Sequence, residues 1–225
     1  MAITFASILF ALAVLSTAAS AEPFFYLVRQ WPTTACDVYH CHDPPHGRDF
    51  SIHGLWPNND DGTWPSFCSQ TKFRRNELRE LIDEMNKYWP SLTGSNEVFW
   101  THEWEKHGTC AGPQITTQHD FFAAALHLHK TLNIEDALSA ASIVPSDSTT
   151  YDTADIVAAL RDALGFAPII TCHNGTIEEV WFCINENLDV EDCEQACTAP
   201  ACHNQHTCPH VRYPEPKGSA AIAAV

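Results

Sequence analysis

The chain carries two stretches that are unusually rich in tryptophan, histidine and glycine: FSIHGLWP at residues 50–57 and FWTHEWEKHGTC at residues 99–110. On a helix, side chains at spacings i, i+1, i+4 and i+5 share one face. The second stretch places four polar side chains at these spacings: His102, Glu103, Lys106 and His107. Trp100 and Trp104, four residues apart, predict an apolar stripe beside that face. The pattern therefore gathers two imidazoles, a carboxylate and an ammonium at one spot.

This arrangement does not match the familiar hydrolase motifs. His102 and His107 lie five residues apart, whereas a zinc protease needs His-Glu-x-x-His. The sequence contains no Gly-x-Ser-x-Gly motif, and its cysteines are expected in disulfide bonds. Histidines without a protein nucleophile suit a substrate that brings its own, as RNA does with its ribose 2′-hydroxyl. The alternative is that His53 is a hydrogen-bonded structural residue and that the second stretch is a solvated helix face.

Both stretches resemble the two active-site signatures of the T2 family of ribonucleases, the secreted acid ribonucleases of plants, fungi and animals. The similarity extends to FYLVRQWP at residues 25–32, which resembles the family's first strand, and to Trp89-Pro90, which resembles its turn before the catalytic helix. It covers nearly the whole mature chain, from Phe24 to about Pro214. Within the family, the chain is most similar to plant S-like ribonucleases.

The resemblance implies an endoribonuclease that cleaves single-stranded RNA through a 2′,3′-cyclic phosphate, without metal or cofactor. His107 resembles the general base and His53 the general acid, although the residues alone do not say which is which. Glu103 and Lys106 resemble groups that stabilise charge on the phosphorus, and His102 one that holds the phosphate. Imidazoles exchange protons between about pH 5 and 7, so the chemistry suits an acidic medium and needs no metal.

The resemblance also implies residues that bind bases, where stacking is expected. Trp56 and Asn58 would contact one base, and the next would meet Gln30, Ser91 and Phe99. Some plant relatives carry an asparagine at the position of Ser91, so a sharp uridine preference is not implied.

Four disulfide bonds follow from the same resemblance: Cys36 with Cys41, Cys68 with Cys110, Cys172 with Cys208, and Cys183 with Cys193. Plant relatives often carry a further bridge that this chain lacks, because His42 follows Cys41 and no cysteine lies between Cys68 and Cys110. Cys197 and Cys202 are extra and can pair with each other.

The N-terminus predicts entry into the secretory pathway. Residues 1–21 carry no charged side chain, contain a short apolar run at 8–14 and end in Ala19-Ser20-Ala21, which is typical of a cleaved signal peptide. No stretch is long and apolar enough to span a membrane. An even number of cysteines, ten in all, fits a disulfide framework in an oxidising compartment, so we expect a secreted or vacuolar protein.

Two further features of the sequence leave alternatives. The tail gathers residues that can bind zinc, although their spacing matches no finger or ribbon: Cys193, Cys197, Cys202, His203, His206, Cys208 and His210. Asn174-Gly175-Thr176 is an acceptor sequence for N-glycosylation at an expected turn between two strands, and such tripeptides also occur by chance.

The formal charge of −16 argues against binding of nucleic acid by bulk electrostatics. Protonation of all 13 histidines would bring it to −3, so an acidic medium would remove most of the repulsion toward RNA. Acidity that merely keeps a secreted protein soluble explains the composition equally well.

Hydrophobic periodicity predicts one domain at residues 22–216 with a loose tail at 217–225. Strands are expected at 24–31, 49–53, 169–172 and 177–184, with a turn at 58–62 and a loop from Pro32 to about residue 47. Helices are expected at 75–88, 97–107, 118–132 and 153–164, with Gly108 and Gly165 after the second and the last. Strands at both ends with helices between them predict an α+β fold with a mainly antiparallel central sheet, flanked by helices and stapled by disulfides.

The sequence leaves three functions. An S-like ribonuclease that acts as a monomer on single-stranded RNA, with no membrane and no obligate protein partner, is the first. A self-recognition protein on the same scaffold is the second, although family members used that way tend to be basic. A catalytically silent storage protein is the third, but this usually requires loss of a catalytic histidine.

Overall fold

The computed structural model describes residues 23–41, 49–196 and 208–217. The described elements, in chain order, are β1 (Pro23–Gln30), α1 (Pro32–Tyr39), β2 (Ser51–Asn59), a 3₁₀ turn η1 (Arg75–Leu78), α2 (Ile82–Tyr88), α3 (Asn96–Lys106), a 3₁₀ turn η2 (Gly108–Cys110), α4 (Gln118–Thr131), α5 (Ile134–Ala140), β3 (Thr150–Asp152), α6 (Thr153–Leu164), β4 (Ile169–His173), β5 (Thr176–Ile184), β6 (Val190–Glu191), α7 (Cys193–Ala196) and β7 (His210–Arg212). The expected signal peptide, Cys197, Cys202 and the tail from residue 218 lie outside the described residues.

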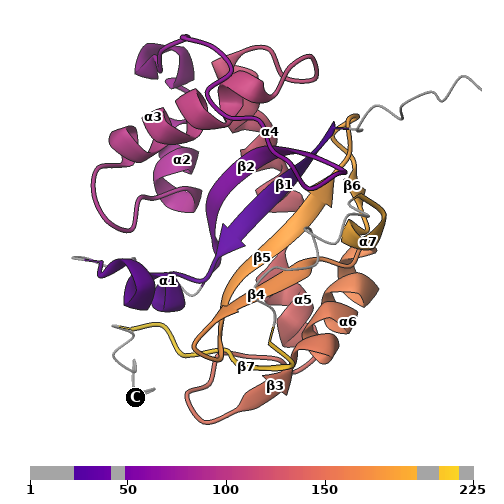
Figure 1. Ribbon diagram of the computed structural model, residues 1–225. Helices are drawn as coiled ribbons and strands as arrows, with labels where there is room; N and C mark the ends of the chain where they lie inside the picture. The colour runs from indigo at the N-terminus through magenta and orange to yellow at the C-terminus, as the bar shows by residue number, and fades with distance from the viewer. Residues whose placement is uncertain (1–22, 42–48, 197–207, 218–225) are drawn as a thin grey trace, which may run out of the picture.

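The seven strands of the described residues form one sheet, in which β2, β1 and β5 lie side by side. β1 pairs antiparallel with both neighbours, and β4 continues the sheet on the other side of β5. Only the short contact between β5 and β7 is parallel. Helices α2, α3 and α4 gather beside β2, whereas α5 and α6 lie behind β4 and β5 (Figure 1). The predicted α+β fold with a mainly antiparallel sheet is confirmed.

The two faces of β1 bury different sets of side chains, because successive residues of a strand point to opposite sides. Phe25 and Leu27 belong to the main core, which packs against the helices. Phe24, Tyr26 and Val28 belong to a smaller apolar cluster, against which Trp56 and Trp181 pack. The site described below adjoins this smaller cluster.

One charged side chain of β1 points into the main core. Arg29 is 1% exposed, and its guanidinium donates hydrogen bonds to the carbonyl oxygens of His129, Leu132 and Phe50. Glu135 lies 3.8 Å from the same guanidinium and accepts a hydrogen bond from the backbone of Phe50. This arginine cluster (Arg29, His129 and Glu135) ties the end of α4 and the start of α5 to the sheet.

Several expected boundaries were wrong. The expected loop after Pro32 begins with α1, because proline is well suited to the first position of a helix, where its missing N–H costs nothing. The helix expected at 75–88 is split into η1 and α2. Apolar residues three apart suit a 3₁₀ turn as well as an α-helix, so the periodicity concealed the break.

The second strand was expected to end near Gly54 and Pro57, but β2 continues to Asn59. It lies at the edge of the sheet, where a proline is tolerated because no ladder hydrogen bond is lost on the open side. The sequence also missed α5, α7 and the short strands β3, β6 and β7. In contrast, α4 and α6 match their predicted ranges closely, and Gly165 ends α6 in the left-handed conformation.

Candidate active site

A β-bulge in β2 presents His53. Val28 pairs with Gly54 and the next residue, Arg29, pairs with Ile52, so His53 has no partner on β1. Such an extra residue bends a strand and re-aims its side chain. The indole of Trp89 donates a hydrogen bond of 2.9 Å to the carbonyl oxygen of His53, and the carbonyl of Trp89 accepts one from Trp100. The tryptophans thus tie the bulge to α3.

The helix α3 carries the second group of candidate residues. Trp100 and Trp104 are buried in the main core, as the apolar stripe predicted. Glu103 is 2% exposed, and its carboxylate accepts a hydrogen bond of 3.0 Å from the indole of Trp56. His102 is exposed and Lys106 is half-buried.

His107 follows α3 as its C-terminal cap, so the helix ends one residue earlier than expected. Gly108 is therefore not the cap. It is needed for close packing, because a Cβ at this position would lie 2.3 Å from the ring of Trp104. His107 is 6% exposed, and its Nδ1 has no hydrogen-bond partner among the described residues.

Trp56 lies against both candidate histidines. Its ring is stacked on His107 with centroids 5.4 Å apart, and it meets His53 edge to face at 4.9 Å. Trp181 supports it from β5. A Cβ on Gly54 would lie 2.1 Å from the Trp56 indole nitrogen and 2.3 Å from a carboxylate oxygen of Glu103, so this position has room only for glycine. We call four of the candidate catalytic residues, His53, Glu103, Lys106 and His107, the catalytic cluster.

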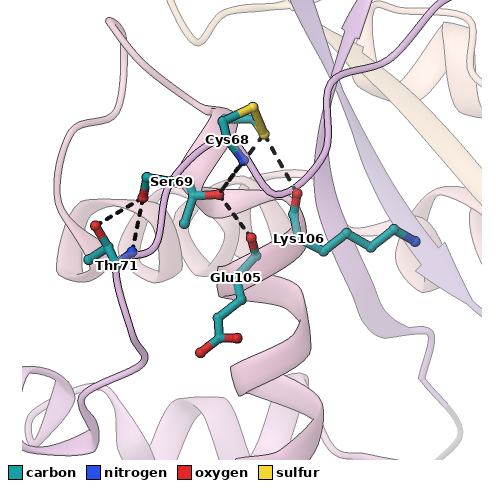
Figure 2. The surroundings of a disulfide bond; sticks show 7 residues. Cys68, Ser69, Thr71, Glu105 and Lys106 are labelled. Carbon is teal, nitrogen blue, oxygen red and sulfur yellow. Dashed lines mark hydrogen bonds between the residues drawn. A yellow bond between two sulfur atoms is a disulfide. The ribbon is translucent and has the colours of Figure 1, made fainter.

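A disulfide holds the loop after β2 against the end of α3. Cys68 is bonded to Cys110, and its backbone N–H donates to the hydroxyl of Thr109 (Figure 2). The backbone N–H of Phe67 donates to the carbonyl of Lys106, while the Lys106 side chain extends away from the disulfide (Figure 2). Phe67 and Trp64 are exposed aromatic side chains of this loop, and Phe67 lies beside His102.

The electrostatic surroundings separate the two histidines. Burial alone would lower the pKa of His53, but the hydrogen bond and charge of Glu179, with the charge of Glu103, raise it above its ordinary value. Burial, with the charges of Lys106 and His102, lowers the pKa of His107 to about 3. At pH 5, His53 is therefore protonated and His107 is neutral.

Two neighbouring groups are shifted as well. Burial raises the pKa of Glu103 to about 7, although the positive charge of His53 and the Trp56 hydrogen bond oppose the shift. Partial burial and the charge of Lys106 lower the pKa of His102. Below neutral pH, Glu103 is thus a carboxylic acid and can donate a hydrogen bond.

A pocket of about 190 Å³ opens beside His53. It is lined by Gln30, Tyr39, His53, Ser91, Leu92, Thr93 and Phe99. Three of the expected base-binding residues therefore lie together, namely Gln30, Ser91 and Phe99. Asn58 is half-buried farther along β2 and does not line this pocket.

Sequence reasoning missed several residues at the site. Tyr39, Leu92 and Thr93 come from segments without a recognisable motif. Glu179 on β5 contacts His53 across 126 positions of the sequence. The available signal in the sequence was a carboxylate within an expected apolar strand.

The four disulfide bonds that the resemblance implied are all present. Two of the tail residues considered as zinc ligands, Cys193 and Cys208, are therefore bonded to Cys183 and Cys172. Within the described residues, no three histidine, cysteine or carboxylate side chains gather in a way that would hold a metal ion. Asn174 is exposed in the turn between β4 and β5.

The sequence of the chain is similar to that of known proteins of one family. Residues 22–193 match the sequence model described as the Ribonuclease T2 family. The chain is 46% identical over 173 residues to Ribonuclease DdI of Dictyostelium discoideum, covering 76% of this chain and 77% of the relative. It is 41% identical over 175 residues to Extracellular ribonuclease LE of Solanum lycopersicum, covering 72% of this chain and 76% of the relative.

The fold is also shared with solved structures. The crystal structure of RNase NT in complex with 5′-AMP superposes with a TM-score of 0.77 at 35% sequence identity, covering 87% of this chain and 99% of that one. On the strength of its sequence and its fold, this chain belongs to the ribonuclease T2 family.

Proposed function

We propose that this protein is an endoribonuclease that cleaves single-stranded RNA by acid–base catalysis between His53 and His107. The observation that carries the proposal is the opposite displacement of the two histidine pKa values within one cluster. Groups whose environments push their pKa values apart identify the acid and the base of a reaction.

In the first step, neutral His107 accepts the proton of the ribose 2′-hydroxyl while the 2′-oxygen attacks the phosphorus. The bond from phosphorus to the 5′-oxygen breaks, and protonated His53 donates its proton to that oxygen. The products are a 2′,3′-cyclic phosphate and a 5′-hydroxyl. Slower hydrolysis of the cyclic phosphate exchanges the two roles.

The remaining polar groups act on the phosphate. Lys106 forms no ion pair with any carboxylate among the described residues, so its charge is available to the developing oxyanion. Glu103, protonated below about pH 7, can donate a hydrogen bond to a phosphate oxygen. His102 is exposed at the edge of the cluster, where it can hold the same group. This chemistry requires neither a metal nor a cofactor.

The position of the pocket predicts which nucleotide it receives. His53 lines the pocket and protonates the leaving 5′-oxygen, so the base of the leaving nucleotide stacks beside it, against Phe99. Trp56 and Asn58 are proposed to meet the base on the other side of the scissile bond. The exposed ring of Trp64 offers a further surface for stacking.

We further propose that the protein acts as a monomer in the secretory pathway, outside the cell or in the vacuole. The four disulfides support an oxidising compartment. Within the described residues, no helix has the length and hydropathy needed to cross a bilayer. Cleavage after Ala21, a glycan on Asn174 and the molecular mass in solution can be measured on the protein purified from its source.

Digestion of a short RNA and of its 2′-deoxy counterpart at pH 5, in the presence of a chelator, tests the proposed reaction. We expect cleavage of the RNA alone, with a cyclic phosphate as the first product. An intact RNA would show that the scaffold serves storage or recognition. Cleavage of the deoxy strand, or inhibition by the chelator, would contradict the mechanism.

A further inference from the structure

The carboxylate of Glu179 lies directly behind His53. Its Oε1 is 2.6 Å from Nδ1 of His53, and its Oε2 accepts a hydrogen bond of 2.7 Å from the indole of Trp181. The side chain of Glu179 is 11% exposed and that of His53 is 22% exposed, so the contact is largely shielded from water.

A second irregularity of the sheet aims Glu179 at this place. Thr171 of β4 pairs with Glu179, but the next residue, Cys172, pairs with Ile177, so the register between the two strands shifts by one residue at Glu178. Ile177 and Val180 therefore both face the main core, while Glu179 and Trp181 face the catalytic side. Two bulges on different strands thus bring His53 and Glu179 together.

We propose that Glu179 is the positioning residue of the general acid: it accepts the Nδ1–H of His53 and thereby directs Nε2 toward the leaving 5′-oxygen. This inference rests on the proposed ribonuclease reaction and assigns a role to a residue outside the two signature stretches. Glu179 does not touch the substrate in this account, since it lies behind the ring and acts through it.

With the proton of His53 on Nδ1, only a carboxylate fits this position. Two N–H donors, from His53 and Trp181, meet the two oxygens of Glu179, so both oxygens must accept. A glutamine has a single acceptor oxygen and would leave one donor facing an NH₂ group. The negative charge also favours the imidazolium form of His53.

Other ionisable groups also face His53, and their charges influence how readily its ring is protonated. From the region of α3 come Glu103, Lys106, His102 and His107. Glu103 supports the protonated imidazole only when its carboxylate is ionised, above about pH 7, whereas Lys106 opposes it. Among the described residues, only Glu179 forms a hydrogen bond with the ring of His53.

The test compares Glu179→Gln with Glu178→Gln, which removes the same charge from the neighbouring position. Both variants are assayed from pH 3 to 8 on RNA and on a nucleoside 3′-(4-nitrophenyl phosphate). In the second substrate, the 2′-oxygen displaces 4-nitrophenolate, which leaves with its electron pair and needs no proton. Thermal unfolding of each variant verifies that it is folded.

For Glu179→Gln we expect kcat/KM on RNA to fall about 10- to 100-fold. A positioned proton donor supplies roughly 10²- to 10⁴-fold, and the variant should lose only part of this factor. The alkaline limb of its pH profile should move to lower pH. The loss should largely disappear on the nitrophenyl substrate, whereas any loss in Glu178→Gln should be the same on both substrates. Equal losses of Glu179→Gln on both substrates would show a merely structural role and overturn the inference.

A measurement on the wild type keeps the proposal testable if Glu179→Gln does not fold. Nitrogen-15 NMR of neutral His53 should show the proton on Nδ1, and a proton on Nε2 would overturn the inference. Failure of the two proposals is distinguishable. If wild type leaves RNA intact, the ribonuclease reaction is wrong. If wild type cleaves and Glu179→Gln keeps its activity and pH profile, only the role of Glu179 is wrong.

Discussion

The two buried polar clusters of the sheet, one on each side of the β1–β2 pair, use their groups differently. In the arginine cluster, the Nη atoms of Arg29 donate to backbone carbonyls, and Glu135 accepts from a backbone N–H. In the catalytic cluster, Glu103 and His53 are held by side chains, and His53 lines an open pocket. Hydrogen bonds to the backbone stabilise the fold. Polar groups that are held by side chains beside a pocket can still bind a substrate.

Histidines show the same contrast. Burial and the charges of Arg29 and Lys130 lower the pKa of His129 to about 2, so a strongly shifted pKa is not by itself a sign of catalysis. His107 differs from His129 because a second histidine, His53, lies nearby with its pKa shifted in the opposite direction. Both His53 and His107 contact Trp56. The pair, rather than either residue, indicates the reaction.

The largest predicted effect separates these histidines by activity. Because a positioned acid or base contributes roughly 10²- to 10⁴-fold, His53→Ala and His107→Ala should each lower kcat/KM on RNA by that amount. His129→Leu should leave kcat/KM unchanged, since His129 belongs to the arginine cluster and its ring packs on Tyr88. Steady-state kinetics at pH 5 decide this, and an equal loss in all three variants would abolish the distinction.

The next effect concerns the disulfide that holds the end of α3, beside the catalytic cluster. Cys68 and Cys110 are 42 positions apart, whereas Cys36 and Cys41 are 5 apart. Chain-entropy arguments give about 4 kcal/mol for the longer loop and about 2 kcal/mol for the shorter one. Urea unfolding of the two double-serine variants measures these costs. The Cys68→Ser/Cys110→Ser variant should also lose activity, because its bond holds the chain around Lys106.

Acid stability tests the arginine cluster. His129 has a lowered pKa in the folded protein, so in mildly acidic solution its ring is protonated in the unfolded chain but not in the folded one. Its contribution to stability is present above the unfolded pKa of about 6.5 and is lost as the pH falls toward 2. At pH 4 this loss is about 3 kcal/mol. His129→Leu should therefore lose less stability than wild type between pH 7 and pH 4 in urea titrations, and an identical loss would show that His129 is not the source.

A smaller effect is expected from a single methyl group beside Glu103. Gly54→Ala places a carbon against the Trp56 indole and the Glu103 carboxylate, and overpacking of this kind costs about 1–3 kcal/mol. Activity should fall because the same atoms serve the reaction. Gly94→Ala is the matched control, because nothing lies within 4 Å of its added Cβ. Equal behaviour of the two variants in unfolding and activity assays would contradict the tight packing.

The sequence predicted the regular parts of the fold and the two signature stretches of the site. Helix α3 was expected to within a residue at each end, because its tryptophan spacing is a local signal. Pro32 and Pro57 misled the prediction, since a proline can begin a helix or lie in an edge strand as well as end an element. Which of these holds depends on tertiary neighbours.

The rest of the site depends on long-range pairing. The bulge at His53 and the one at Glu178 appear only when the strands are paired, and no local pattern specifies them. Glu179 reaches His53 because β5 lies beside β1, an adjacency between segments about 150 residues apart in sequence. The opposite pKa shifts of His53 and His107 likewise come from burial and from charges that the fold assembles.

Titration of the two histidines in the free protein, followed by NMR of their ring carbon-bound protons, tests the central claim most directly. The account predicts a pKa for His53 above the ordinary value of about 6.5 and a pKa for His107 well below it, near 3. The reverse order, with His107 titrating above His53, would contradict the assignment of His53 as acid and His107 as base.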